Sequence, residues 1–187
     1  MTKDSERLLT TARGGKAKTG PFNNPLDFIA EDHMREREVC ALIDKLVTAS
    51  STKSAERKMI VEFLTEQLPL HLADEEIDLF PMMLERCDPE EEIKELIEKL
   101  EADHGHALAD APAIAALIEV NKTSDTGFSE KACARMIDFA GHARRHLILE
   151  NAIILPIARV RLTEDDLETM RNHMRERRLD HHKEKTK

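Results

Sequence analysis

The fold of this chain is decided by two copies of one pattern, HLADEEIDLFP at residues 71–81 and HLILENAIILP at residues 146–156. Both copies have the spacing His-x3-Glu-x5-Pro. On an α-helix, a histidine and a glutamate separated by one turn project from the same face. The pattern therefore predicts an internal repeat, in which two helices each present an imidazole beside a carboxylate.

Each copy of the repeat follows an isolated Asp-His pair, Asp32-His33 before the first copy and Asp103-His104 before the second. Imidazole nitrogens and carboxylate oxygens are common metal ligands in proteins. The chain has nine histidines, and four of them belong to this arrangement. The candidate metal ligands are His33, His71, Glu75, His104, His146 and Glu150.

The composition limits the kind of protein that this chain can be. Its 187 residues are enough for one domain with a buried core. A net charge of −9 and the lack of a basic patch interleaved with aromatic residues argue against nucleic acid as a partner. No apolar run approaches the length of a membrane span, so we expect no membrane partner. Three widely spaced cysteines fit buried thiols in a reducing compartment, and we expect a cytoplasmic protein.

Five helical patterns and no convincing strand follow a polar, glycine-containing amino terminus. We therefore expect an all-α fold, an up-down-up-down four-helix bundle with a flexible N-terminal arm and a polar C-terminal helix. The expected parts are the arm at 1–22, the bundle at 23–160 and the polar helix with its tail at 161–187. Helix starts are predicted at Asn24-Pro25, Asp88-Pro89, Ser129 and Thr163-x-x-Asp166.

Apolar residues and candidate ligands share one stripe on each predicted helix. On the third helix the stripe includes Leu108 beside His104, and on the fourth it includes Ile153 beside Glu150. Prolines lie inside or near the ends of the helices, where the missing N–H disfavours a regular turn, so we expect kinks or breaks there. These prolines are Pro69, Pro81, Pro112 and Pro156.

The positions of the four candidate histidines fit an antiparallel bundle. In a hairpin of two helices, residues that are equidistant from the turn lie at the same height. The midpoints between successive histidines all fall on predicted turns; they are residue 52, the junction of 87 and 88, and residue 125. The bundle would therefore place all four histidines in one layer, with both glutamates one turn away.

Four imidazoles and two carboxylates suit iron, zinc or manganese better than calcium, which prefers oxygen ligands. A structural zinc needs four ligands, so six candidates favour a dinuclear site. Each metal would take two histidines, His33 with His71 and His104 with His146, and the two glutamates would bridge the metals. Each metal would then keep a position for a small ligand. The alternative is a set of structural ion pairs, in which Arg or Lys compensates the buried carboxylates.

These residues resemble the hemerythrin-like domains, also called HHE cation-binding domains, over roughly residues 24–160. The resemblance rests on the six candidate ligands and on the Phe-Pro and Leu-Pro endings of the repeat. It implies two Fe ions, joined by an oxo or hydroxo bridge, that meet O2, nitric oxide or peroxide. Leu108 stands where oxygen-carrying hemerythrins have a second histidine, and His-x3-Glu replaces their His-x4-Asp. Both differences favour the four-His, two-Glu site of di-iron repair and iron-sensing relatives.

Several other polar residues have more than one interpretation. His142 is a candidate additional ligand, because it lies one turn before the last histidine of the site; it could instead hydrogen-bond a ligand or satisfy a core contact. His106 is expected to face outward, and His173 is expected to belong to a solvated tail. Asp32 and Asp103 could orient histidines of neighbouring helices or serve as helix-surface charge.

Three functions are compatible with these expectations. The first is a di-iron protein that binds or responds to O2, nitric oxide, peroxide or iron supply. The second is a di-iron enzyme that reduces peroxide or nitric oxide, or assists iron–sulfur repair, with an unidentified electron donor. The third is a structural bundle that binds zinc incidentally. Neutral imidazoles donate less charge than carboxylates, which favours ligand binding over hydrocarbon oxidation, so we predict the first function and leave enzymatic turnover open.

Overall fold

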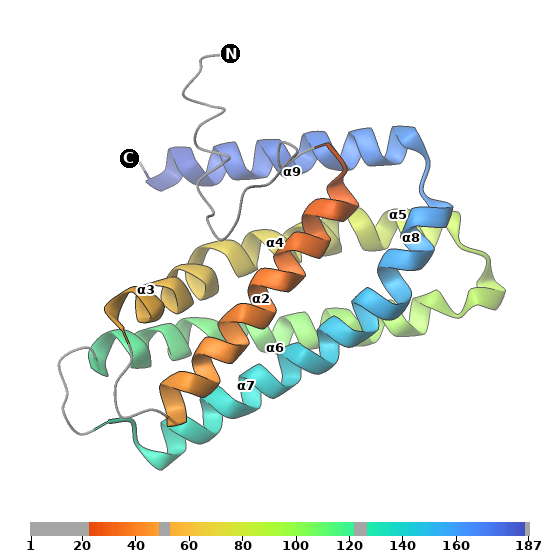
Figure 1. Cartoon of the computed structure of the whole chain (residues 1–187). Coiled ribbons are helices and arrows are strands. Elements are labelled where there is room, and N and C mark those ends of the chain that lie inside the picture. The colour runs from red at the N-terminus through yellow and green to blue at the C-terminus, as the bar shows by residue number, and fades with distance from the viewer. Residues whose placement is uncertain (1–22, 49–52, 122–126, 186–187) are drawn as a thin grey trace.

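The computed structural model describes residues 23–48, 53–121 and 127–185, and all regular structure in these ranges is helical. Four helical stretches pack side by side as a bundle, and a last helix lies across one side of it (Figure 1). The expected all-α bundle is therefore confirmed. The arm expected at 1–22 falls outside the described residues. Within the described ranges, no helix is both long and apolar enough to cross a membrane.

The first and third stretches are mainly regular, whereas the second and fourth alternate between α-helical and wider π-helical turns. The first stretch is α2 (Pro25–Thr48). The second consists of α3 (Ser54–Glu62), η1 (Phe63–Gln67), α4 (Leu68–Asp74), η2 (Glu75–Leu79) and α5 (Phe80–Arg86). The third is a short 3-10 turn, η3 (Pro89–Glu91), followed by α6 (Ile93–Val120). The fourth consists of α7 (Glu130–Leu149), η5 (Glu150–Ile154) and α8 (Leu155–Arg161), and the last helix is α9 (Glu164–Lys185).

Polar side chains cap three helices where the sequence predicts a start. Asn24 Oδ1 accepts a hydrogen bond from the N–H two residues later at 2.9 Å, and Ser129 Oγ accepts one from the N–H three residues later at 3.3 Å. Thr163 and Asp166 bond each other reciprocally at the start of α9, with backbone-to-side-chain distances of 2.9 and 3.2 Å. These contacts satisfy N–H groups that the first helical turn leaves without partners.

The third helix does not begin at Asp88 as expected. A reciprocal capping box between Asp88 and Glu91 closes a short 3-10 turn. Glu92 then adopts the left-handed conformation, with φ of 53°, and α6 begins at the next residue. The left-handed conformation costs a non-glycine residue about 1 kcal/mol. Ile93, which directly follows Glu92, is buried, so the left-handed conformation occurs where the chain turns back into the core.

Prolines coincide with the π-helical turns. Pro69, Pro81 and Pro156 each occupy the second residue of the α-helix that follows a π turn. A proline ring crowds the carbonyl four residues earlier and offers no N–H, and a wider turn relieves this conflict while the helix continues. The helices are therefore not broken at these three prolines, and the irregularity expected there takes the form of π turns. The fourth, Pro112, lies inside α6.

The π turn of the fourth stretch changes which residue faces the core. Ile153, expected to face inward, is 37% exposed, whereas Ile154 is fully buried. A π turn contains one extra residue, so the inward position moves along by one. Leu108 also differs from the expectation and is 40% exposed. It lies about 40° from His104 around the axis of α6, whereas buried Ala111 lies about 20° away.

The apolar core has two parts, separated along the bundle by a polar layer. The first part includes Phe63 and Met136, and the second includes Phe80 and Leu100. On α2, His33 lies between residues of the two parts. The two parts of the apolar core therefore border the polar layer on both sides along the bundle.

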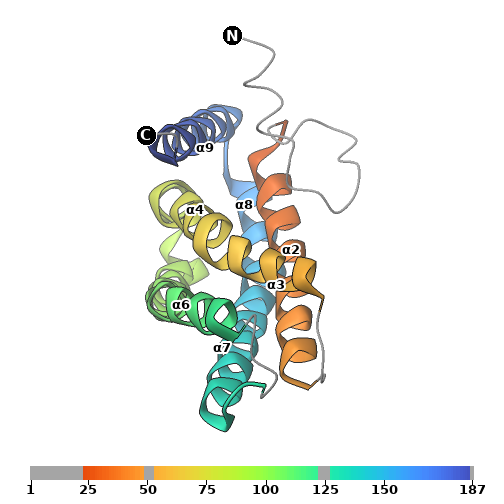
Figure 2. The same cartoon turned by 90° about the vertical axis from the view of Figure 1, so that its left-hand side faces the viewer.

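α9 is held against the bundle by buried ion pairs as well as by apolar contacts. Met170 and Met174 are fully buried in the second part of the core. Arg178 Nη2 donates to Asp74 Oδ2 at 2.6 Å, and Arg177 Nε donates to Asp74 Oδ1 at 2.9 Å. Asp74 is completely buried, so these guanidinium groups compensate its charge. Figure 2 shows α9 outside the other helices and above α4.

Asp78 provides a second buried contact for α9. It pairs with Arg177, and its Oδ1 lies 2.6 Å from His173 Nδ1. His173 therefore belongs to the interface, and the expectation of a solvated tail was wrong for this residue. The signal was present in the sequence, because His173 and Arg177 are one turn apart on α9 and Asp74 and Asp78 are one turn apart on their own stretch.

Replacement of Arg178 by alanine is expected to lower the free energy of unfolding by about 2 kcal/mol, because it removes one of the two guanidinium partners of the buried Asp74 carboxylate. Urea denaturation followed by circular dichroism measures this, since the chain has no tryptophan or tyrosine. Lys183→Ala is the matched control: it removes the same charge from the same helix, but its pair with Asp180 is exposed, so we expect little change. Equal effects of the two substitutions would contradict a buried attachment of α9.

Candidate metal centre

Side chains from all four stretches of the bundle converge in the polar layer. They form two overlapping groups, and within each group every side chain offers one ligand atom within 4.8 Å of the others. The groups are His33, His71, Glu75 and Glu150, and Glu75, His104, His146 and Glu150. All six residues are buried, and both glutamates are shared by the two groups. The structure thus brings together the six candidate ligands that the sequence singles out.

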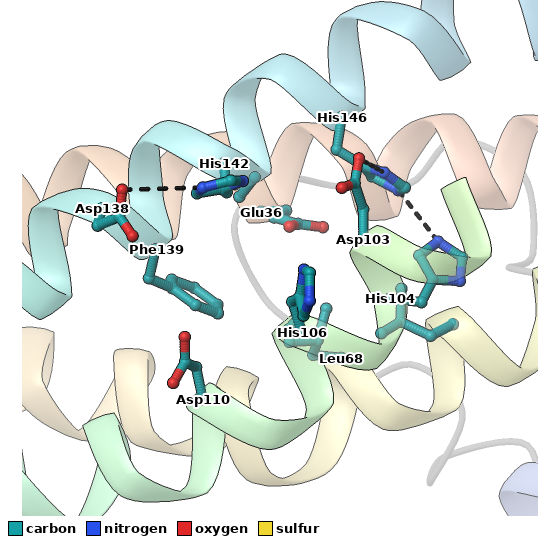
Figure 3. A pocket seen from close by; sticks show the side chains of 13 residues that line it. Glu36, Leu68, Asp103, His104, His106, Asp110, Asp138, Phe139, His142 and His146 are labelled. Carbon is teal, nitrogen blue, oxygen red and sulfur yellow. Dashed lines mark hydrogen bonds and ion pairs between the residues drawn. The ribbon is translucent and has the colours of Figure 1, made fainter. Parts of the chain in front are cut away.

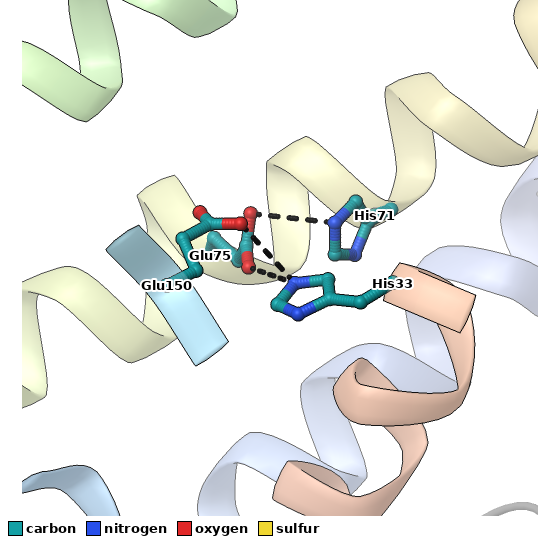
Figure 4. Close-up of side chains that lie close together, drawn as sticks. All are labelled: His33, His71, Glu75 and Glu150. Carbon is teal, nitrogen blue, oxygen red and sulfur yellow. Dashed lines mark hydrogen bonds and ion pairs between the residues drawn. The ribbon is translucent and has the colours of Figure 1, made fainter. Parts of the chain in front are cut away.

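In the first group, His33 contacts both shared glutamates. Its Nε2 is 3.2 Å from Glu75 Oε1 and 3.2 Å from Glu150 Oε2 (Figure 4). His71 Nε2 is 3.6 Å from Glu75 Oε2, as the spacing of one helical turn predicts. Two ligands that each lie about 2.1 Å from one metal are about 3.0–3.4 Å apart. The observed distances are therefore close to those of a coordination sphere.

The second group has the same character. His146 Nε2 is 2.9 Å from Glu150 Oε1, and His104 Nε2 is 3.5 Å from Glu75 Oε2. The Nε2 atoms of His104 and His146 are 3.0 Å apart. In both groups the histidines therefore turn the same ring nitrogen toward the shared glutamates.

Two aspartates face the opposite ring nitrogens. Asp103 Oδ2 is 3.6 Å from His146 Nδ1, and Asp32 Oδ2 is 3.9 Å from His71 Nδ1. A carboxylate behind a histidine favours a proton on Nδ1 and leaves Nε2 free for a metal. Neither Nδ1 atom has a hydrogen-bond partner among the described residues, so Asp32 and Asp103 lie near histidines of neighbouring helices and act on them by charge rather than by a hydrogen bond. Asp32 also pairs with Arg35 of its own helix.

Glu76 is a contact that the sequence analysis missed. Its Oε1 lies 3.0 Å from His104 Nδ1, and this hydrogen bond orients the ring. Asn151 occupies the equivalent position in the second copy of the repeat and contacts His33. Burial lowers the pKa of His33, and the charge of Glu150 and the contact with Asn151 partly oppose this effect. The signal in the sequence is the position directly after each repeat glutamate, which in both copies reaches a histidine of an Asp-His pair.

Burial makes the layer electrostatically unfavourable for isolated charges. It lowers the pKa of His71 well below the ordinary value of a histidine. Burial, together with the negative charge of Glu150, raises the pKa of Glu75 well above its ordinary value. Burial acts in the same direction on Glu150, but contacts with histidines of the second group outweigh it and lower the pKa. Simultaneous ionisation of the two shared carboxylates is therefore unfavourable in this layer.

Several atoms directed at the layer have no hydrogen-bond partner among the described residues. They include His71 Nε2, Glu75 Oε2 and Glu150 Oε2. A buried polar atom without a partner costs about 1–3 kcal/mol. Metal ions would accept electron pairs from these atoms and offset the buried negative charge, so the residues fit a metal pair.

A cavity of about 230 Å³ reaches the second group from outside (Figure 3). His104 and His146 contribute to its lining. His142 lines the same pocket but belongs to neither ligand group. One turn of α7 separates His142 from His146, which places it about 6 Å away along the helix. Its side chain is 55% exposed and lies 3.8 Å from Asp138. His106 is exposed, as expected, and also lines the pocket.

Glu36 is a further polar residue that the sequence analysis missed. It lies on α2 one turn after His33 and is only 5% exposed. Figure 3 shows its carboxyl group in the pocket, between His142 and His146. Burial, and next the charge of Glu150, raise the pKa of Glu36 to about 8. Its spacing from His33 placed it on the inward face, but it lies outside the repeat that drew attention to the other residues.

The bundle and the overlapping ligand groups define a helical metal-binding domain with positions for two ions. Residues 24–158 match the family model of the hemerythrin HHE cation binding domain. The chain therefore belongs to this family, as the resemblance of its motifs predicts. Comparisons with curated proteins and with solved structures produced no match. α9 lies beyond the matched residues.

Replacement of Glu75 by glutamine should separate metal binding from apolar packing. Without metal, the variant should be at least as stable as the parent, because it removes a carboxyl group whose burial is unfavourable. With metal at about a thousand times the dissociation constant, the parent should gain about 4 kcal/mol and the variant much less. Thermal unfolding with and without added metal measures both quantities.

The control for this experiment is Glu62→Gln, which makes the same chemical change at an exposed position of α3. It should behave as the parent does in both conditions. A full metal-induced gain in the Glu75 variant would contradict a ligand role for this glutamate.

Proposed function

We propose that this chain is a non-haem di-iron protein that binds or responds to a small ligand, such as O2, nitric oxide or peroxide, or to iron supply. The observation that carries the proposal is the overlap of the two ligand groups on one pair of glutamates. Shared carboxylates hold two ions close enough to act together on one small molecule.

The proposed ligands divide equally between the two ions. His33 and His71 would hold one iron, and His104 and His146 would hold the other, with the two glutamates between them. Bound iron would supply redox-active, Lewis-acidic centres with positions open to a small ligand. The protein itself acts on the imidazoles through carboxylates behind them and shields the layer with apolar core on both sides.

The donor set supports iron over a structural zinc site. Structural zinc sites use four ligands and often thiolates, whereas nitrogen and oxygen donors without sulfur suit iron or manganese. None of the cysteines in the described ranges belongs to either ligand group. Cys40 lies in the apolar core, where burial raises its pKa to about 12.

The two halves of the site differ in their access to solvent. The pocket is lined by His104 and His146, whereas neither His33 nor His71 lines it. A small ligand would therefore reach the iron held by His104 and His146 before it reaches the other iron. Unequal access favours binding of one small molecule at one end of the metal pair.

A di-iron enzyme that reduces peroxide or nitric oxide, or assists iron–sulfur repair, is the competing proposal. It requires an electron donor, and we propose no specific one. The partners that we propose are small molecules in the cytoplasm, with neither nucleic acid nor a membrane involved; the net charge of −9 agrees with the first exclusion.

Protein produced with iron should contain about two iron atoms per chain and show the near-ultraviolet absorption of bridged ferric ions. Metal analysis and absorption spectroscopy of the purified chain measure this. One zinc per chain, or no metal, would contradict the di-iron proposal.

Addition of nitric oxide or peroxide then separates the two functions. A stoichiometric spectral change without turnover supports a binding or sensing protein. Repeated consumption of the ligand in the presence of a chemical reductant would favour the enzyme instead. His104→Ala, which removes one ligand of the accessible half, should abolish the spectral change in either case.

A further inference from the structure

The acidic side chains that line the pocket beside the second ligand group become less exposed toward its inner end. The exposed fraction of the side chain falls from 74% at Asp138 to 40% at Asp110 and 30% at Asp103. It ends at Glu36, which is 5% exposed. Four acidic side chains thus lead from the surface to the buried histidines of the second group.

The composition of the pocket favours a cation. Besides these carboxylates it contains the imidazoles of His106 and His142, and none of the described residues that line it is lysine or arginine. Arg135 pairs with Asp110 from outside the lining, so one of the outer charges is partly compensated. A cleft lined by one sign of charge concentrates ions of the opposite sign and repels ions of the same sign.

Glu36 lies at the inner end of this pocket. Within the described ranges it has no hydrogen bond or ion pair, although it is almost completely buried and its carboxyl group points into the pocket (Figure 3). A buried carboxylate without a partner is unfavourable, and a cation beside it removes that cost. Nitrogen and oxygen donors together suit a divalent transition ion such as Fe²⁺.

We propose that this pocket is the uptake site for divalent metal ions, and that the Glu36 carboxylate binds each ion on its way to the buried ligands. The inference rests on the proposed metal centre, whose six ligands are buried and therefore need a route for the metal. A single carboxylate suits a transient binding site, because it binds an ion firmly enough to attract it and weakly enough to release it to the buried ligands.

The test is the rate of metal uptake by the full chain after its metal has been removed. Co²⁺ serves as the probe, because its visible absorption reports coordination without any redox step. Stopped-flow absorption gives the rate, and titration gives the final number of ions bound. Glu36→Gln keeps the size of the side chain and replaces its carboxyl group by an amide that cannot become a carboxylate ligand, whereas Glu95→Gln makes the same change at an exposed position of α6 outside the pocket.

We expect Glu36→Gln to slow uptake about tenfold, within the range of rate gains that a charged cleft provides. It should still bind two ions at equilibrium, and Glu95→Gln should match the parent in both measurements. Equal uptake rates in the parent and Glu36→Gln would overturn the proposal. A Glu36→Gln variant that binds fewer ions than the parent would also overturn it, because Glu36 would then be a resident ligand.

The same data separate this inference from the proposed function. A parent protein that binds one ion contradicts the binuclear centre, while a slower Glu36→Gln variant still supports the uptake route. A parent that binds two ions, with no effect of Glu36→Gln on the rate, supports the centre and overturns the route. A parent that binds no Co²⁺ overturns both.

Discussion

The rest of the structure depends on the burial of two carboxylates among four imidazoles in the middle of an apolar bundle. Glu75 and Glu150 are fully buried, and apolar packing flanks their layer on both sides. Such a layer is costly without positive charge, and the described basic residues do not enter it; the arginines of α9 compensate Asp74 and Asp78 instead. Metal ions account for the layer better than structural ion pairs do, since both ligand groups converge on the same two glutamates.

The repeat combines ligand placement with helix geometry. In each copy a π turn begins at the glutamate and ends two residues before the proline. A wide turn thus begins at each repeat glutamate and precedes the proline, and the register of the next core residues changes with it. The two halves of the site nevertheless differ in their surroundings. α9 packs against the stretch that carries His71, whereas the pocket opens beside His104 and His146.

Much of this arrangement could be predicted from the sequence, because the repeat and the Asp-His pairs are local patterns with one-turn spacing. The bundle and the meeting of the six side chains follow from them. The prediction failed where tertiary contacts or register changes decide. Ile153 is displaced outward by a π turn, and His142 lies toward the open end of the pocket. His173 pairs with Asp78, 95 positions away; the one-turn spacings on both helices are visible in the sequence, but only the packing of α9 brings the two residues together.

The central claim is that two metal ions occupy the layer, each held by two histidines and both glutamates. Anomalous X-ray diffraction at the iron absorption edge, from crystals of the iron-loaded protein, tests it most directly. The account predicts two peaks about 3.5–4 Å apart, one beside Nε2 of His33 and His71 and the other beside Nε2 of His104 and His146. A single peak in the layer, or peaks elsewhere with the layer empty, would contradict it.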